Sequence, residues 1–413
     1  MPDPQAVVTI SRRGADRIRA GHVWVYRSDV TDLQHVYPGA LVRVEEDRDR
    51  AARGQPKSRI DPGLGRPQQS KRFLGSGFYS SASEIALRLV APTAIEDLPG
   101  LLGERIQAAI RYRERFVHDS NAYRLIFSEG DGLPGWIVDR YNDILSLQVL
   151  TQAMDRGDLR QRLISELDRA FEPASMVERV DARVRRLEEL PEKHDGLIMG
   201  EKTSTEIAMN GVRFRFEALG GQKTGAFLDQ RENYAAAASY ARGEALDVFC
   251  YQGGFALHLA KACQRVTGAD SSRPALEIAE QNAALNGQEI EWIEANAFDL
   301  LRDYADSGRQ YDAIVLDPPA FARSRSNLNS ALAGYKELNL RALKMLRPSG
   351  ILVTCSCSYH VHPTEFLDMV ASAALDSHRI LRILENRGQA KDHPSILGIP
   401  ETSYLKCLIA SVS

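Results

Sequence analysis

The spacing of apolar and polar positions changes along the chain and divides it into three parts. In the first part, residues 1–92, short apolar segments are interrupted by Gly and Pro, which predicts a small β-rich domain. Its expected strands are Ala6–Ile10, Val23–Tyr26, Leu41–Glu45, Phe73–Tyr79 and Ile85–Leu89.

The second part, residues 93–205, mixes longer amphipathic segments with short apolar runs. Helical spacing extends over Leu101–His118 and Asp155–Phe171. The apolar runs that predict strands are Trp136–Asp139, Ile144–Leu150, Ser175–Arg179 and Gly196–Met199. We therefore expect a small central α+β domain that contacts substrate or links the two flanking domains.

In the third part, residues 206–413, apolar strands alternate with amphipathic helices, which is typical of a doubly wound parallel sheet. The expected strands are Glu244–Val248, Arg265–Asp270, Glu289–Glu294, Tyr311–Leu316, Gly350–Cys355 and Leu405–Ala410, and helices begin near Gly254, Arg273, Phe298, Leu328 and Pro363. The pattern predicts an α/β Rossmann-like domain. Such domains bind their ligands at the carboxyl ends of the strands.

The composition narrows the class of protein. With 413 residues, of which 44% are hydrophobic and 26% charged, the chain resembles a globular protein of more than one domain. No stretch reaches the roughly eighteen apolar residues of a membrane span, and the start lacks the apolar core of a secretory signal. All five cysteines lie in the second half without a disulfide spacing, and Cys355 and Cys357 lack the partners of a zinc site. We expect a cytoplasmic protein with reduced thiols, no membrane association and no metal.

Positive charge is concentrated in the segment Arg48–Arg72. The net charge of −3 does not by itself indicate nucleic-acid binding, so an RNA-binding surface would have to be local. The segment Arg48–Arg72 contains eight basic residues and two acidic ones. It is either a phosphate-contacting loop or a solvated insertion, and charge alone does not separate these readings.

Glycine and polar residues follow the expected strands of the third part. The first strand leads into a turn at Gly253-Gly254 without the G-x-G-x-x-G fingerprint, which disfavours a dinucleotide. Asp270 ends the next strand about twenty residues later, where an acid can accept both hydroxyls of a ribose. Asn296 follows the third strand and suits the edge of a purine, and Asp317-Pro318-Pro319 forms a stiff loop after the fourth. Together these residues predict a nucleoside site.

The motifs from Asp247 to Phe255, at Asp270 and at Asp317-Pro318-Pro319 look like those of class I methyltransferases that use S-adenosylmethionine. Further blocks resemble the bacterial large-subunit rRNA cytosine-5 methyltransferases of the RlmI type, namely Ser128–Gly135, Gln222–Arg231, Tyr335–Asn339, Ser356–Ser358 and Asp392–Pro394. In that family an N-terminal PUA domain and a small central domain precede the methyltransferase domain, which agrees with parts 1–92, 93–205 and 206–413. The similarity to a PUA domain rests on Gly21–Tyr26 and Leu74–Tyr79.

The resemblance implies roles for individual residues. The residues implied at the methionine end of the cofactor are Phe249, Tyr251, Gly253 and Phe255, and those at the ribose and adenine are Asp270, Asn296 and Ala297. Those that close over it are Lys223, Thr224, Asp229 and Gln230, and Asp317 is a further cofactor-binding residue. Asn296 departs from the acid expected there, although an amide can still accept a hydrogen bond from the adenine amino group. The basic segment Arg48–Arg72 also departs from the family, in which a tighter turn is expected.

The chemistry of such an enzyme requires a nucleophile. Carbon 5 of cytosine reacts only after a covalent bond forms at carbon 6, and a thiolate is suited to form that bond. In the resemblance Cys357 occupies the nucleophile position, while Cys355 stands where an apolar residue is usual. Related enzymes carry a second cysteine near the double proline, but this chain has Ala320, so Asp317 or a water that it orients is the expected base.

Two other functions stay open at this stage. Methylation of an exocyclic amine of guanine or adenine shares the fold and the Asp-Pro-Pro loop but would leave Cys357 idle. A non-catalytic RNA-binding or ribosome-assembly factor would retain only a vestigial pocket, which the set of Gly253, Asp270 and Asp317 opposes. The expected partner is RNA, foremost large-subunit rRNA either naked or in an assembly intermediate. The sequence leaves the target nucleotide and the oligomeric state open, a homodimer included.

Overall fold

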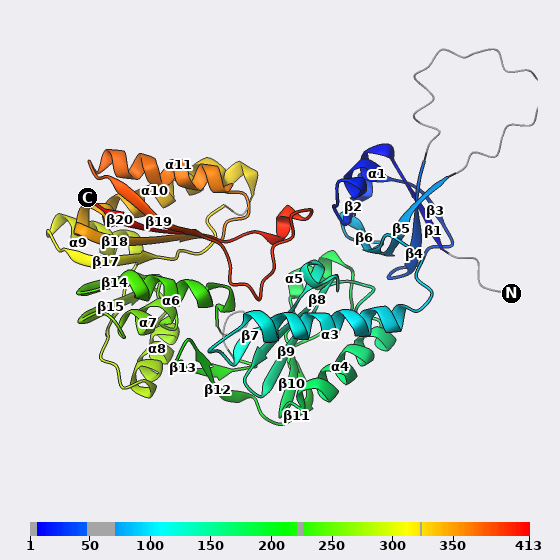
Figure 1. The fold of residues 1–413 in the computed structure, drawn as a ribbon, viewed down its shortest axis with the longest axis horizontal. Helices are drawn as coiled ribbons and strands as arrows, with labels where there is room; N and C mark the ends of the chain where they lie inside the picture. The colour runs from blue at the N-terminus through cyan, green and yellow to red at the C-terminus, as the bar shows by residue number, and fades with distance from the viewer. Residues whose placement is uncertain (1–5, 48–70, 221–225, 323) are drawn as a thin grey trace, which may run out of the picture.

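The computed structural model describes residues 6–47, 71–220, 226–322 and 324–413. Within these residues the chain forms an N-terminal β-rich part, a central α+β part and a C-terminal α/β part (Figure 1). Most of the basic segment Arg48–Arg72 lies outside the described residues, as do Lys223 and Thr224. In the part that the structure describes, no helix is long and apolar enough to cross a membrane.

The N-terminal part is built on a six-stranded sheet of order β2-β6-β5-β4-β1-β3. Its elements are β1 (Val7–Ile10), α1 (Arg12–Arg19), β2 (Trp24–Tyr26), β3 (Val30–Gln34), β4 (Leu41–Glu46), β5 (Arg72–Tyr79) and β6 (Ile85–Ala91). The five expected strands are all present. Helix α1 and strand β3 were not expected, because α1 is strongly polar and four of the five residues of β3 are exposed.

The central part consists of helices packed on a five-stranded sheet of order β11-β10-β9-β8-β7. Its elements are α3 (Leu98–Phe116), β7 (Ala122–Phe127), β8 (Trp136–Tyr141), β9 (Ile144–Val149), α4 (Gly157–Phe171), β10 (Ser175–Glu178), α5 (Ala182–Leu187) and β11 (Gly196–Gly200). The fully buried Trp136 lies in its core with residues from α3 and α4.

A hairpin connects the central part to the C-terminal part. Its strands are β12 (Ser204–Met209) and β13 (Val212–Glu217), so the domain boundary expected between residues 205 and 206 falls inside β12. Phe216 of the hairpin stacks on Tyr141 of the central sheet at a ring-centroid distance of 3.7 Å. Both rings belong to the core that also contains residues of the C-terminal sheet.

The C-terminal part is a seven-stranded sheet of order β16-β15-β14-β17-β18-β20-β19. Its strands are β14 (Glu244–Val248), β15 (Arg265–Asp270), β16 (Glu291–Glu294), β17 (Tyr311–Leu316), β18 (Leu346–Ser356), β19 (Leu381–Arg387) and β20 (Lys406–Val412). The first five are parallel, and β20 pairs antiparallel with both β18 and β19. The adjacent strands β14 and β17 form the switch point at which such sheets bind ligands.

Helices cover both faces of this sheet (Figure 1). Those on one face are α6 (Arg231–Tyr240), α7 (Gly254–Leu259) and α8 (Arg273–Leu285), and those on the other are α9 (Ala297–Asp306), α10 (Leu328–Met345) and α11 (Pro363–Asp376). The doubly wound α/β domain expected from the sequence is therefore confirmed, with strands β14, β15 and β17 at the expected residues.

Side-chain contacts join the N-terminal part to the other two. Trp24 Nε1 donates a hydrogen bond of 2.9 Å to Glu129 Oε1 in the central part. The His22 ring lies 3.0 Å from the Glu401 carboxylate, in the segment between β19 and β20. That segment therefore reaches from the α/β sheet to the N-terminal part.

Candidate functional site

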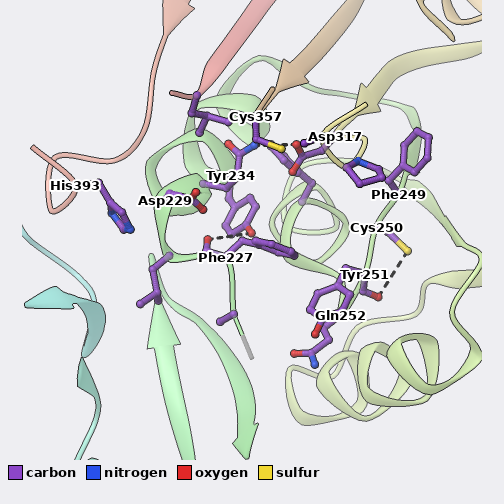
Figure 2. A pocket seen from close by; sticks show the side chains of 18 of the residues that line it. Phe227, Asp229, Tyr234, Phe249, Cys250, Tyr251, Gln252, Asp317, Cys357 and His393 are labelled. Carbon is purple, nitrogen blue, oxygen red and sulfur yellow. Dashed lines mark hydrogen bonds between the residues drawn. The ribbon is translucent and has the colours of Figure 1, made fainter. Parts of the chain in front are cut away.

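A cavity of about 1130 Å³ lies at the carboxyl ends of β14, β15 and β17. Figure 2 shows Cys357 and Asp317 at the top of this cavity and Tyr251 with Gln252 at the bottom. The residues that line it from the α/β part include Phe227, Asp229, Gln230, Phe249, Tyr251, Phe255, Asp270, Asp317 and Cys357, and those from the central part include Arg124, Arg179 and Asp181. The site thus draws on two of the three parts of the chain.

The turn after β14 has an unusual backbone. Phe249 and Tyr251 adopt φ angles of 68° and 49°, in the left-handed region that non-glycine residues rarely enter, and Gly253 has φ of 88°. Such conformations cost about 1–3 kcal/mol each for non-glycine residues and cluster at ligand sites. A Cβ on Gly254 would approach the Tyr234 ring to 2.5 Å, so this glycine permits close packing of α7 against α6. Gly253 shapes the turn without lining the cavity.

Asp270 ties this turn to strand β15. Its Oδ2 accepts a hydrogen bond of 2.9 Å from the Tyr251 N–H, and its Oδ1 accepts one of 2.8 Å from the Ser272 N–H. Each carboxylate oxygen can accept a further bond. Because Asp270 also lines the cavity, its carboxylate is fixed where it can accept hydrogen bonds from the hydroxyl groups of a ligand.

Asp247, near the carboxyl end of β14, is fully buried and bonds to the helix that follows the turn. Its Oδ2 accepts a hydrogen bond of 2.8 Å from the Ala256 N–H in the first turn of α7. Its Oδ1 has no hydrogen-bond partner among the described residues. Burial raises the pKa of Asp247 well above its usual value, because a charged carboxylate is disfavoured away from water.

A chain of polar side chains orients Asp317. Gln230 Nε2 donates to Asp317 Oδ1 over 3.0 Å, and Asn233 Nδ2 donates to Gln230 Oε1 over 2.7 Å. Arg387 Nε in turn donates to Asn233 Oδ1 over 2.7 Å. Because the Gln230 Oε1 accepts from Asn233, the Gln230 Nε2 must face Asp317. Both Gln230 and Asn233 are buried, so water does not compete for these bonds. Sequence reasoning missed Asn233 and Arg387, because neither α6 nor β19 was expected.

Cys357 lies just beyond the last residue of β18 and lines the cavity, whereas Cys355 is fully buried inside the strand. Strand alternation alone would put both on one side, but β18 ends at Ser356 and Cys357 already belongs to the following turn. Cys355 faces Cys407 of β20, and burial raises the pKa of its thiol well above the usual value. The cavity therefore contains the cysteine that the resemblance favours.

The turn that contains Cys357 is held by its neighbour Ser358. The hydroxyl of Ser358 bonds to the Tyr335 hydroxyl over 2.9 Å and accepts the Ala322 N–H over 3.1 Å. Lys406 Nζ donates to the Ser358 carbonyl over 2.7 Å. Tyr335 was part of the resembling blocks without an assigned role, and sequence reasoning missed Lys406.

The remaining expected cofactor residues fall into two groups. Asp229 lines the cavity, and its Oδ2 accepts the Tyr404 hydroxyl over 2.7 Å. Asn296 is exposed and caps α9, because its Oδ1 accepts the Phe298 N–H over 2.9 Å. Asn296 and Ala297 do not line the cavity, and their contact with adenine stays a prediction.

Asp392, from the resembling block Asp392–Pro394, joins the central and C-terminal parts. Its Oδ2 accepts the Arg124 N–H of β7 over 2.8 Å, and its Oδ1 lies 3.1 Å from an Arg231 guanidinium nitrogen of α6. The Asp392 carbonyl accepts a bond of 2.7 Å from Arg113 of α3. The next residue, His393, lines the cavity (Figure 2). This junction sets the position of the central part against the site.

Comparisons with known proteins agree with this arrangement. Residues 162–402 match the family of S-adenosylmethionine-dependent methyltransferases, and residues 8–54 match a PUA-like domain. The chain is 40% identical over 351 residues to ribosomal RNA large subunit methyltransferase I of Shewanella denitrificans, covering 83% of this chain and 88% of that protein. It is 37% identical over 370 residues to the Vibrio parahaemolyticus protein of the same name, covering 86% and 92%.

Solved structures show the same fold at lower identity. A protein described as a methyltransferase complexed with SAH superposes with a TM-score of 0.80 at 17% identity, covering 98% of this chain and 99% of that one. A protein from Streptococcus mutans, described as a SAM-dependent methyltransferase, gives a TM-score of 0.78 with the same identity and coverage. These two structures therefore share the fold of this chain over nearly its whole length.

Proposed function

Because this chain belongs to the ribosomal RNA large subunit methyltransferase I family of S-adenosylmethionine-dependent methyltransferases, we propose that it methylates carbon 5 of a cytosine in large-subunit rRNA through a covalent bond to Cys357. The observation that supports the covalent route most directly is that Cys357 and Asp317 line the same cavity as Asp270. An exocyclic-amine methyltransferase would have no use for a cysteine at that place.

The residues of the cavity fit the cofactor. Asp270 presents a fixed carboxylate for the ribose hydroxyls, and the aromatic rings of Phe227, Phe249 and Tyr251 surround the space beside it. The volume of about 1130 Å³ exceeds the roughly 300–1,000 Å³ of a site for one drug-sized ligand. A flipped-out nucleotide could therefore enter beside the cofactor. We propose that Gly253, Phe255, Asp229, Gln230, Lys223, Thr224, Asn296 and Ala297 complete the cofactor site, as the resemblance implies.

The reaction can be written with the residues of this chain. S-adenosylmethionine supplies an electrophilic methyl group on its sulfonium. The Cys357 thiolate would add to carbon 6 of the cytosine, and the new S–C6 bond would raise the electron density at carbon 5. Carbon 5 would then take the methyl group as the methyl–sulfonium bond breaks, and S-adenosylhomocysteine would leave as a neutral thioether. Asp317, or a water that it orients, removes the proton from carbon 5. The S–C6 bond then breaks, which restores the aromatic ring and the thiolate.

The other expectations form part of the same proposal. The PUA-like part would contact the RNA, and with rRNA as the substrate we expect the protein in the cytoplasm, away from any membrane.

We also propose a homodimer through the edge strand β19, because a sheet edge can pair with a second copy across a twofold axis. Ile383 and Leu384 of β19 are 59% and 39% exposed. Sedimentation equilibrium would give twice the chain mass of 45.9 kDa, and a monomer mass would remove the homodimer.

The covalent step can be tested with RNA that contains 5-fluorocytosine at the target position. Fluorine prevents the elimination that releases the enzyme, so the wild-type protein should form an adduct that survives denaturation. Cys357→Ser should abolish both adduct and turnover while S-adenosylmethionine binding persists. The matched control Cys355→Ser should still form the adduct, because Cys355 lies inside the sheet.

Each alternative has its own outcome in this experiment. An adduct that vanishes in Cys355→Ser and persists in Cys357→Ser would transfer the nucleophile to Cys355. A product methylated on an exocyclic amine, identified by nucleoside mass spectrometry, would replace the cytosine-5 assignment. A wild-type protein that binds RNA without any methyl transfer would be the non-catalytic factor.

A further inference from the structure

Lys406, the first residue of β20, is a buried cation without a carboxylate partner. It is 7% exposed, and no Asp or Glu in the described ranges lies within ion-pair distance of its ammonium group. Its Nζ donates instead to two backbone carbonyls, Ser358 over 2.7 Å and Tyr404 over 2.9 Å. Burying an unpaired ammonium is costly, and an apolar side chain at this position would avoid that cost. A charged side chain at this buried position therefore indicates a function for the Lys406 ammonium.

The register of the sheet places this charge under the turn that contains Cys357. Lys406 pairs with Ser356 across the antiparallel strands β18 and β20, and its ammonium bonds to the carbonyl of Ser358. Cys357 lies between these two contacts in sequence. The Ser358 hydroxyl also accepts the Ala322 N–H, which follows the Asp-Pro-Pro loop. Lys406 thus acts on the one turn that joins the nucleophile to the base.

The electrostatics point the same way. Burial lowers the pKa of Lys406 to about 8, and the charge of Cys357 works against this shift. At neutral pH Lys406 is therefore still mainly protonated. In the described ranges, the titratable groups around Cys357 include Lys406 on β20, Tyr335 on α10 and Asp317 after β17. Asp229 and Tyr404 lie across the cavity, as do Arg124, Arg179 and His393. Lys406 is the cation whose hydrogen bond reaches the residue next to Cys357.

We propose that Lys406 is a positioning residue for Cys357. The Lys406 ammonium fixes the Ser356–Ser358 turn and stabilises the Cys357 thiolate against the negative charge of Asp317. This inference rests on the proposed role of Cys357 as nucleophile. Its chemical content is separate, because thiolate formation at Cys357 can be measured without RNA or turnover.

The test is the pH dependence of alkylation of Cys357 by iodoacetamide in the full-length protein, followed by mass spectrometry of the Cys357 peptide. Lys406→Gln removes the charge and keeps a hydrogen-bond donor, whereas Lys406→Arg keeps the charge. We expect the alkylation profile of Lys406→Gln to move up by about one pH unit, which is about tenfold slower alkylation at pH 7. Lys406→Arg should follow the wild type. Methyl transfer by Lys406→Gln should slow about tenfold at pH 7 and recover at higher pH.

A purely structural role would lower the melting temperature of both variants and leave the alkylation profile in place, and that result would overturn the proposal. Affinity for S-adenosylmethionine, measured by calorimetry, reports whether each variant is folded. If Lys406→Gln does not fold, Lys406→Met is compared with Lys406→Arg in the same assay. A wild-type protein that forms no adduct with 5-fluorocytosine RNA would remove the proposed function, yet a shift in the alkylation profile would still establish the effect of Lys406 on Cys357.

Discussion

Asp270 is the residue whose substitution should affect cofactor binding most directly. Its carboxylate accepts the Tyr251 and Ser272 N–H groups and faces the cavity. We expect Asp270→Ala to weaken S-adenosylmethionine binding by about 1–3 kcal/mol, through loss of charge-assisted hydrogen bonds to the ribose. Isothermal titration calorimetry measures this change. Asp303→Ala, at an exposed position of α9, is the control, and equal affinities in the two variants would argue against the ribose contact.

Asp247 should make stability fall as the pH rises. Its pKa is raised in the folded protein, so the folded state binds a proton more tightly than the unfolded state. The stabilisation is complete below the unfolded pKa, near 3.8, and is lost as the pH rises towards the folded value. Asp247→Asn keeps an acceptor for the Ala256 N–H and has no proton to lose. Its melting temperature should gain on the wild type as the pH rises above about 4, and a constant difference would refute this explanation.

Some residues of the candidate site could be predicted from the sequence alone, and others could not. Asp270, Asp317 and Cys357 could be placed at one sheet edge because each follows a strand with a clear apolar pattern. The polar chain from Arg387 through Asn233 to Gln230 could not be predicted, because neither α6 nor β19 was expected and Arg387 lies 154 residues from Asn233 in sequence. The same holds for Lys406, whose contact with the Cys357 turn depends on the pairing of β18 with β20.

At the scale of elements, the segment between β19 and β20 should control stability through Asp392. Asp392→Ala would remove the nearer carboxylate of the buried Arg231 guanidinium and leave it the more distant one of Glu232, at 3.6 Å. The expected cost is about 3–5 kcal/mol in the free energy of unfolding. Urea denaturation measures this change. The exposed pair of Lys336 and Asp376 provides the control, because Asp376→Ala should cost less than about 1 kcal/mol. Similar losses in both variants would contradict the assigned role of the junction.

The same carboxylate should give a pH dependence opposite to that of Asp247. Burial alone would raise the pKa of Asp392, but His393, Arg231 and the Arg124 N–H together hold it below its usual value. Its contribution is present above the unfolded pKa, near 3.8, and is lost as the pH falls towards the folded value. In Asp392→Asn we expect a smaller loss of stability on acidification below pH 4 than in the wild type.

Two of the elements that the sequence did not predict, α6 and β19, lack a clear apolar period. Strand β19 exposes most of its residues, and α6 is rich in alanine, so neither presents a clear apolar period. Hairpin strand β13 is different, because Val212, Phe214 and Phe216 alternate with charged residues and are all buried. That strand could have been predicted from its period of two. The parallel strands β14, β15 and β17 were predicted at their observed bounds because each is a short, mainly buried segment that a turn and an amphipathic helix follow in the sequence.

At the scale of the whole molecule, the charge distribution predicts how RNA affinity responds to salt. The net charge of −3 leaves the basic residues of Arg48–Arg72 as the strongest local concentration of positive charge in the sequence. Replacing those residues with serine should weaken RNA binding and flatten its dependence on salt concentration, because fewer counterions are released. Filter binding at several salt concentrations measures both. An unchanged affinity and slope would make this segment a solvated insertion.

The place of β20 in the sheet has a consequence for the synthesis of the protein. Strand β20 lies between β18 and β19, although both precede it in sequence. A nascent chain therefore has a gap in the sheet beside the Cys357 turn until the residues of β20, Lys406 among them, are translated. Pairing across this gap has to wait for translation of those residues. We expect the enzyme to become active only after β20 has left the ribosome that makes it.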